Sequence, residues 1–152
     1  MKKATIAIII TGAVSLAGLA AAQRPAQSQT AEVFKSPTCG CCANWVKHLE
    51  AAGFTTKVTN VDDMTEVKAK YGVPGRMQSC HTAVVGGYVL EGHVPAADVQ
   101  RLLKDKPAVV GVAVPGMPIG SPGMEVGTTV QPYDVLTFNK QGQTTVFASH
   151  GR

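Results

Sequence analysis

An α/β fold with a mixed central sheet is predicted by two observations. Candidate strands and helices alternate from residue 32 to residue 106, and three cysteines lie together between the first strand and the first helix. Such alternation is typical of domains in which helices cover a sheet. After residue 107 the chain becomes rich in proline and glycine, so an irregular segment is expected to follow the alternating part.

The first half of the domain contains two predicted strand–helix pairs. Residues 32–35 form a short candidate strand that ends at a Ser-Pro-Thr turn. From residue 42 apolar side chains recur at helical spacing until a glycine at 53 ends the pattern. Residues 55–61 favour a second strand because they combine valines with threonines. Residues 62–70 favour a helix capped by one of its two leading aspartates.

The second half begins with a predicted hairpin and a third helix. Residues 82–91 are two apolar runs around a Gly-Gly pair, the two-residue turn of a tight hairpin. Residues 95–106 begin with proline, carry a leucine and valine face, and end with lysines that suit a helix C-terminus. Residues 112–125 hold too much proline and glycine for regular structure. Residues 135–147 suggest a closing hairpin.

This order of elements, with the cysteines between the first strand and the first helix, is the thioredoxin-like arrangement. The prediction is therefore a thioredoxin-like α/β domain with a mixed central sheet and flanking helices, a Pro/Gly/Met-rich loop and a C-terminal β-hairpin. About 130 residues are enough for one domain with a single core. We assign this metal-binding domain to 31–152 and a flexible leader to 23–30.

The N-terminal segment 1–22 reads as an export signal. Lys2 and Lys3 precede an almost wholly apolar run from residue 4 to residue 19, and three alanines then form a small-residue cleavage site. The run is short for a membrane anchor, which is the competing interpretation. We therefore expect cleavage near Gln23, no stable membrane anchor afterwards, and a periplasmic location.

Charge identifies no macromolecular partner. Without Lys2 and Lys3 the chain keeps 12 basic and 10 acidic residues. It has no basic block and no interleaving of basic and aromatic residues, the features that indicate nucleic-acid binding. We expect no nucleic-acid partner.

All four cysteines belong to the expected mature chain, and three of them form the cluster Cys39-Gly40-Cys41-Cys42. At a helix N-terminus the positive dipole end and free N–H groups stabilise a thiolate. Thiolates attack disulfides and bind soft metals, and a third sulfur in one turn favours the metal. Together with Cys80, the cluster offers four sulfurs that select copper(I) or, less favoured here, zinc.

Residues outside the cluster complete the candidate site. In a thioredoxin-like fold the segment entering the third strand faces the cysteine turn, so Cys80 and His81 are expected to meet the cluster. His81 could be a metal ligand, a hydrogen-bond donor to one of the ligands, or a residue at the edge of a strand. Met117 and Met124, each in a Pro-Gly-Met sequence, are weak candidate ligands because thioethers are soft. His93 is expected to be structural, and His48 and His150 to face solvent.

Two rival functions stay open. The first is an enzyme, a thiol-disulfide oxidoreductase in which Cys39 attacks and Cys42 resolves. The second is an interaction module stapled by disulfides, which would have no free thiols. The cysteines therefore allow either copper or thiol oxidoreductase chemistry in addition to metal binding.

Four motifs carry a family resemblance over roughly residues 33–147: Cys39-Gly40-Cys41-Cys42, Ser79-Cys80-His81-Thr82-Ala83, Glu91-Gly92-His93-Val94-Pro95 and the proline- and glycine-rich segment 115–125. In this order they resemble the periplasmic CopG-like copper-resistance proteins. That family is often labelled only as a metal-binding domain of unknown function.

The resemblance implies a thioredoxin-like domain that binds copper in periplasmic copper or silver tolerance. The matching metal positions are Cys39, Cys41, Cys42 and Cys80. Bridging thiolates in a small polynuclear copper cluster look like what the family uses. The implied partners are copper ions and other periplasmic copper-handling proteins. The resemblance leaves open whether copper is stored, transferred or changed in oxidation state.

Overall fold

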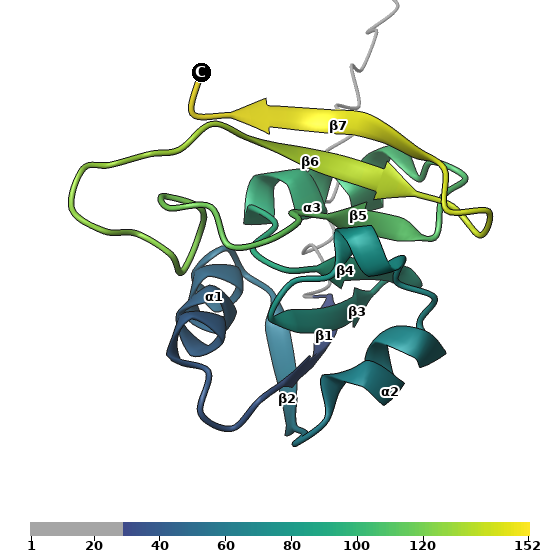
Figure 1. Ribbon diagram of the computed structural model, residues 1–152, viewed down its shortest axis with the longest axis horizontal. Helices are drawn as coiled ribbons and strands as arrows, with labels where there is room; N and C mark the ends of the chain where they lie inside the picture. The colour runs from purple at the N-terminus through teal and green to yellow at the C-terminus, as the bar shows by residue number, and fades with distance from the viewer. Residues whose placement is uncertain (1–28) are drawn as a thin grey trace, which may run out of the picture.

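The computed structural model describes residues 29–152, which form a seven-stranded mixed sheet with three α-helices (Figure 1). The strand order in the sheet is β2-β1-β3-β4-β5-β6-β7. The expected export signal, 1–22, lies outside the described residues. So does most of the expected leader 23–30, but Thr30 already belongs to the first strand, which corrects the end of that segment.

The first half of the fold confirms the predicted strand–helix pairs. Its elements are β1 (Thr30–Lys35), α1 (Gly40–Ala51), β2 (Thr55–Asn60), α2 (Met64–Lys70) and the short 3₁₀ helix η1 (Gly75–Met77). Asp63 caps α2, because its Oδ1 accepts a hydrogen bond of 2.8 Å from the Thr65 N–H. β1 lies between β2, to which it is parallel, and β3, to which it is antiparallel.

The central hairpin is also confirmed. β3 (His81–Val85) and β4 (Tyr88–Glu91) are antiparallel and are joined by Gly86 and Gly87, whose φ angles are +55° and +86°. Two successive residues with positive φ are what a tight hairpin turn requires. The helix α3 (Ala96–Asp105) follows where proline 95 predicted it.

The strand β5 (Gly111–Ala113) corrects the sequence analysis, which placed residues 112–125 entirely in an irregular loop. β5 pairs in parallel with β4. Gly111 permits this pairing, because a Cβ atom at this position would lie 2.0 Å from the Val89 carbonyl oxygen. The remaining loop leads to β6 (Tyr133–Phe138) and β7 (Thr144–His150), which form the predicted closing hairpin.

The sheet is covered on both faces. Leu90 of β4 packs in a cluster with Trp45 and Leu49 of α1 and Leu102 of α3. Its neighbour Val89 packs in a second cluster with residues that follow α2. Adjacent strand residues point to opposite faces, so α1 and α3 cover one face and the α2 region covers the other. Within residues 29–152, no helix is both long enough and apolar enough to cross a membrane.

Candidate metal centre

The three clustered cysteines lie at the junction of β1 and α1, as predicted. Cys39 is the N-cap of α1, with extended backbone, and its Sγ accepts a hydrogen bond of 3.3 Å from the Cys42 N–H. A polar side chain at this position satisfies one of the N–H groups that a helix start leaves without a partner. Capping therefore aims the Cys39 sulfur at the first turn of α1, which contains Cys41 and Cys42.

Two of the four cysteines are joined and two are free. Cys39 and Cys42 form a disulfide with a Cα–Cα distance of 5.4 Å. Cys41 and Cys80 are free and partly buried. A stapled module without free thiols does not fit this arrangement, whereas a redox-active pair beside additional thiols does.

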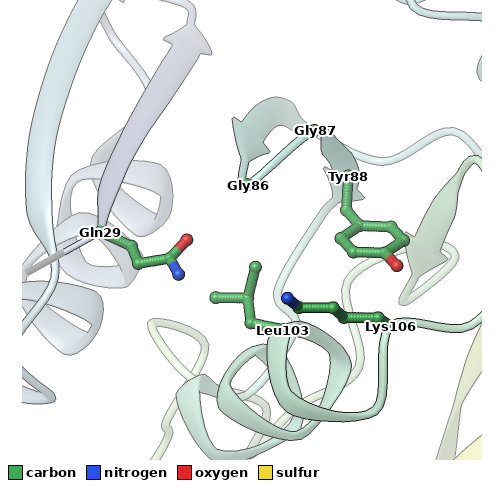
Figure 2. Close-up of a pocket in the computed structure, with 6 residues that line it drawn as sticks. All are labelled: Gln29, Gly86, Gly87, Tyr88, Leu103 and Lys106. Carbon is green, nitrogen blue, oxygen red and sulfur yellow. The ribbon is translucent and has the colours of Figure 1, made fainter. Parts of the chain in front are cut away.

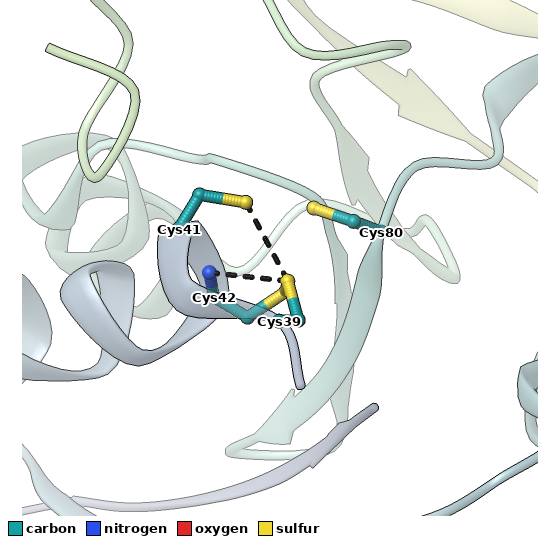
Figure 3. A group of neighbouring side chains, drawn as sticks. All are labelled: Cys39, Cys41, Cys42 and Cys80. Carbon is teal, nitrogen blue, oxygen red and sulfur yellow. Dashed lines mark hydrogen bonds between the residues drawn. A yellow bond between two sulfur atoms is a disulfide. The ribbon is translucent and has the colours of Figure 1, made fainter. Parts of the chain in front are cut away.

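Cys80 meets the cluster across the fold, which confirms the sequence prediction. The sulfur atoms of Cys39, Cys41, Cys42 and Cys80 all lie within 4.8 Å of one another (Figure 3). The Cys39 and Cys41 sulfurs are 3.5 Å apart. Cys80 immediately precedes β3, and the antiparallel pairing of β3 with β1 places His81 opposite Lys35, the last residue of β1 before the cysteine turn. Four sulfurs at this spacing could hold a metal ion once the Cys39–Cys42 disulfide is reduced.

His93 is a site residue that the sequence analysis missed. Its Nε2 lies 3.0 Å from the Cys80 Sγ, and its Nδ1 lies 2.8 Å from the Pro122 carbonyl oxygen. A carbonyl oxygen only accepts, so Nδ1 carries the proton and Nε2 keeps a lone pair. A histidine that donates one N–H to a carbonyl and turns its other nitrogen to a metal is the usual ligand arrangement.

The predicted hairpin contained the signal that finds His93. The register pairs Val85 with Tyr88 and Thr82 with Glu91. Counting two residues further from the turn places Cys80 opposite His93. The Gly92 N–H bond to the His81 carbonyl, 2.9 Å long, shows that the pairing continues beyond the strands.

His81 lies on the other side of Cys80 and is fully buried. Its Nδ1 is 3.5 Å from the Cys80 Sγ, its ring centroid is 4.3 Å from that of Trp45, and its Nε2 has no hydrogen-bond partner. Burial lowers the pKa of His81 well below its usual value, and the nearby His93 lowers it further. Burial also lowers the pKa of His93. Both imidazoles are therefore neutral at pH 7, the form that binds metals.

The free thiol of Cys80 holds its proton in the absence of metal. Burial, and to a smaller extent the neighbouring Cys41, raise the pKa of Cys80 to about 11. A metal ion must displace this proton when it binds, so binding at this sulfur releases a proton to solvent.

The proline- and glycine-rich segment 115–125, which carries Met117 and Met124, contacts both the cysteine turn at the start of α1 and the segment of Cys80. A Cβ atom at Gly123 would lie 2.6 Å from the Cys41 carbonyl oxygen, so the loop passes directly over the first turn of α1. Met124, the next residue, is half-buried. At the other end of the loop, the Gly116 carbonyl accepts a hydrogen bond from the Ser79 hydroxyl, next to Cys80. Met117 follows Gly116 and is 54% exposed.

Two further histidines are not the solvent-facing residues expected from the sequence. The Nε2 of His48 accepts a hydrogen bond of 3.0 Å from the Ala96 N–H at the start of α3. His150 contacts Asp98 at 2.6 Å and stacks on Tyr133. Both are partly buried and join elements together.

A cavity of about 330 Å³ lies at the Gly86-Gly87 turn, where Gln29, Tyr88, Leu103 and Lys106 also line it (Figure 2). None of its lining residues belongs to the cysteine and histidine cluster. The candidate metal centre is therefore separate from this cavity.

The fold and the site define a class of protein: an α/β protein with a thiol-rich centre able to hold a metal ion. A family model described as a protein of unknown function, DUF411, matches residues 77–124, which include Cys80, His81 and His93. A comparison with curated proteins finds no match.

Two solved structures are similar over most of the chain. One is named copper resistance protein CopG, form 2; it is 46% identical with a TM-score of 0.79, and the match covers 82% of this chain and all of that chain. Form 1 of the same protein is 45% identical with a TM-score of 0.78, covering 83% and 100%. The chain belongs to the CopG-like copper-resistance family, which confirms the resemblance found in the sequence.

Proposed function

We propose that this protein binds copper(I) in copper resistance, with Cys39, Cys41, Cys42 and Cys80 as ligands. The observation that carries the proposal is that four sulfurs from two distant segments lie within 4.8 Å of one another. Thiolates are soft ligands and select copper(I) among the available ions. Zinc also accepts four thiolates, but the copper-resistance name of both similar structures favours copper.

The same geometry supports a polynuclear copper–thiolate cluster. Cys80 belongs to two ligand groups, one with the three clustered cysteines and one with His81 and His93. A thiolate that serves both groups can bridge two copper ions. His81 and His93 then act as nitrogen ligands at the edge of the cluster. Met117 and Met124 are the weaker thioether candidates because they sit on the loop that covers it.

The disulfide supports a redox role for the same site. The Cys39–Cys42 bond occupies two of the four sulfurs, so the complete thiolate set exists only in the reduced protein. Reduction by an external dithiol delivers two electrons and two protons and frees both sulfurs. Copper binding and thiol redox state are then coupled at one site.

The proposal includes a periplasmic location and a thioredoxin-like core. The expected export signal at residues 1–22 supports export. The cysteine turn between β1 and α1 and the β3–β4 hairpin support the thioredoxin-like arrangement. Copper ions, and silver ions of similar softness, are the expected cargo, and periplasmic copper-handling proteins are the expected partners.

The test is copper(I) titration of the reduced protein under anaerobic conditions, in competition with a strong chelator. Cys80→Ser should lower copper affinity or stoichiometry and leave the metal-free fold nearly intact, because a small buried thiol contributes little packing. Unchanged copper binding in this variant would contradict the four-sulfur site.

A second candidate, thiol-disulfide oxidoreductase activity, is favoured by the disulfide at the N-terminus of α1. Insulin reduction by the metal-free protein measures this activity with the same Cys80→Ser variant. If Cys39 and Cys42 suffice for exchange, the variant keeps its rate although it loses copper.

A further inference from the structure

A buried ion pair lies beneath the segment that carries Cys80. The ammonium of Lys68, from α2, contacts the carboxylate of Glu91, at the end of β4, and their side chains are 6% and 0% exposed. Moving two charges out of water is costly unless the geometry is good and further hydrogen bonds satisfy the remaining oxygens. The other hydrogen bonds of Lys68 and Glu91 therefore indicate which residues the ion pair holds in place.

Those partners lie on either side of Cys80 and His81. Glu91 Oε1 accepts a hydrogen bond of 2.6 Å from the Ser79 backbone N–H. Glu91 Oε2 accepts one of 2.6 Å from the Thr82 hydroxyl. Lys68 also donates to that hydroxyl at 3.3 Å. One carboxylate thus fixes the two residues that flank the Cys80-His81 pair.

The segment is also held by the loop that follows β5. The Ser79 hydroxyl donates to the Gly116 carbonyl. Gly92, with a φ of +72°, leaves no room for a side chain: a Cβ atom there would lie 2.5 Å from the Ser79 Oγ and 2.7 Å from the Val114 carbonyl oxygen. Ser79 is therefore held by the Gly116 carbonyl and packs against Gly92, and its hydroxyl also donates to the Cys80 Sγ at 4.0 Å.

Glu91 also stands two residues before His93. The Cys80 sulfur and the His93 Nε2 are 3.0 Å apart. The Glu91 carboxylate binds the backbone N–H of Ser79, the residue just before Cys80. The distance from this ligand pair to the α1 cysteines depends on where the Ser79–Cys80 backbone lies.

We propose that Glu91, whose charge is balanced by Lys68, is a positioning residue for the metal centre. Through its hydrogen bond with the Ser79 N–H, Glu91 holds Cys80 at the distance from the α1 cysteines that a shared metal ion requires. This placement exists before any metal binds. This inference rests on the proposed copper function. A ligand that is already in place loses less conformational freedom when the metal binds. The Lys68–Glu91 pair therefore raises the copper affinity without contacting the ion.

Four variants separate positioning from stability. Glu91→Leu removes both acceptors, and Glu91→Gln keeps one carbonyl oxygen for the Ser79 N–H. The double variant Lys68→Met with Glu91→Leu replaces the whole ion pair by apolar groups and leaves no uncompensated charge. Leu102→Ala in α3 is the matched control, since it lowers stability through the core from a helix that carries no cysteine and no histidine.

Two quantities are measured beside the free energy of unfolding. One is copper(I) affinity by chelator competition on fully folded protein. The other is the alkylation rate of Cys80 in metal-free protein that carries serine at positions 39, 41 and 42. The second reports the placement of Cys80 without any metal.

The double variant should recover much of the stability lost by Glu91→Leu, yet bind copper at least about tenfold more weakly, the usual effect of removing a residue that orients a ligand. Its Cys80 should be alkylated several-fold faster. Glu91→Gln should be intermediate, and Leu102→Ala should keep wild-type affinity and alkylation.

Wild-type affinity and alkylation in the double variant would overturn the positioning role, as would equal affinity losses in the double variant and Leu102→Ala. Failure of the copper function looks different. If the wild type binds no copper while Cys80 alkylation still accelerates in the double variant, the positioning of Cys80 is supported and the copper function is overturned.

Discussion

At the scale of single residues, the candidate metal centre depends on a position where no side chain fits. Gly123 has a φ of +85°, and a Cβ atom added there would lie 2.6 Å from the Cys41 carbonyl oxygen and 2.8 Å from the Trp45 backbone nitrogen. Trp45 in turn donates a hydrogen bond of 2.9 Å to the Val94 carbonyl, next to His93. The loop, α1 and the His93 segment are therefore locked together around the cysteines.

Gly123→Ala should lower the free energy of unfolding by about 1–3 kcal/mol, because the new methyl group meets backbone atoms of α1 in a conformation that alanine rarely adopts. Gly127→Ala is the matched control, since Gly127 also has a positive φ, +56°, but no atom within 4 Å of the added Cβ. Chemical denaturation measures both. Equal losses in the two variants would show that the contact with α1 is unimportant.

At the scale of elements, α1 and α3 are joined by His48 and by core contacts. The His48 Nε2 accepts the Ala96 N–H at the N-terminus of α3, a bond that only the neutral imidazole can make. Burial lowers the pKa of His48, and the opposite effect of Glu125 is smaller. The unfolded chain therefore takes up this proton at a higher pH than the folded protein does.

This difference predicts acid sensitivity. The stability that His48 contributes is fully present above the unfolded pKa of about 6.5 and is lost as the pH falls from there through the lowered folded pKa. Denaturation of wild type and His48→Gln between pH 7.5 and 5 measures it, where glutamine can accept the same bond without titrating. The variant should lose less stability on acidification, and identical pH profiles would rule out a role for His48.

The elements also show where prediction from sequence succeeded. Segment 62–70 contains its own helix cap, and segment 82–91 contains its own hairpin turn. The structure of both segments therefore follows from local chemistry. β5 was missed because three residues beside a proline-rich loop give no periodic signal, and its pairing is decided by β4 and by the close approach at Gly111.

At the scale of the whole molecule, the candidate site brings together residues that are far apart in the chain. Cys80 was predictable because, in the thioredoxin-like arrangement expected from the sequence, the segment entering the third strand faces the cysteine turn. His93 was not recognised, because its role appears only when the hairpin register is extended beyond Glu91. The Lys68–Glu91 ion pair could not be predicted, because the sequence does not say which face of the sheet α2 covers.

The most direct test of the account is copper X-ray absorption of the reduced, copper(I)-loaded protein, compared with Cys80→Ser. The account predicts a first shell dominated by sulfur at about 2.3 Å, the metal–thiolate distance, and a smaller sulfur count in the variant. A first shell of nitrogen and oxygen alone, or the same sulfur shell in both proteins, would contradict copper binding by the four cysteines together.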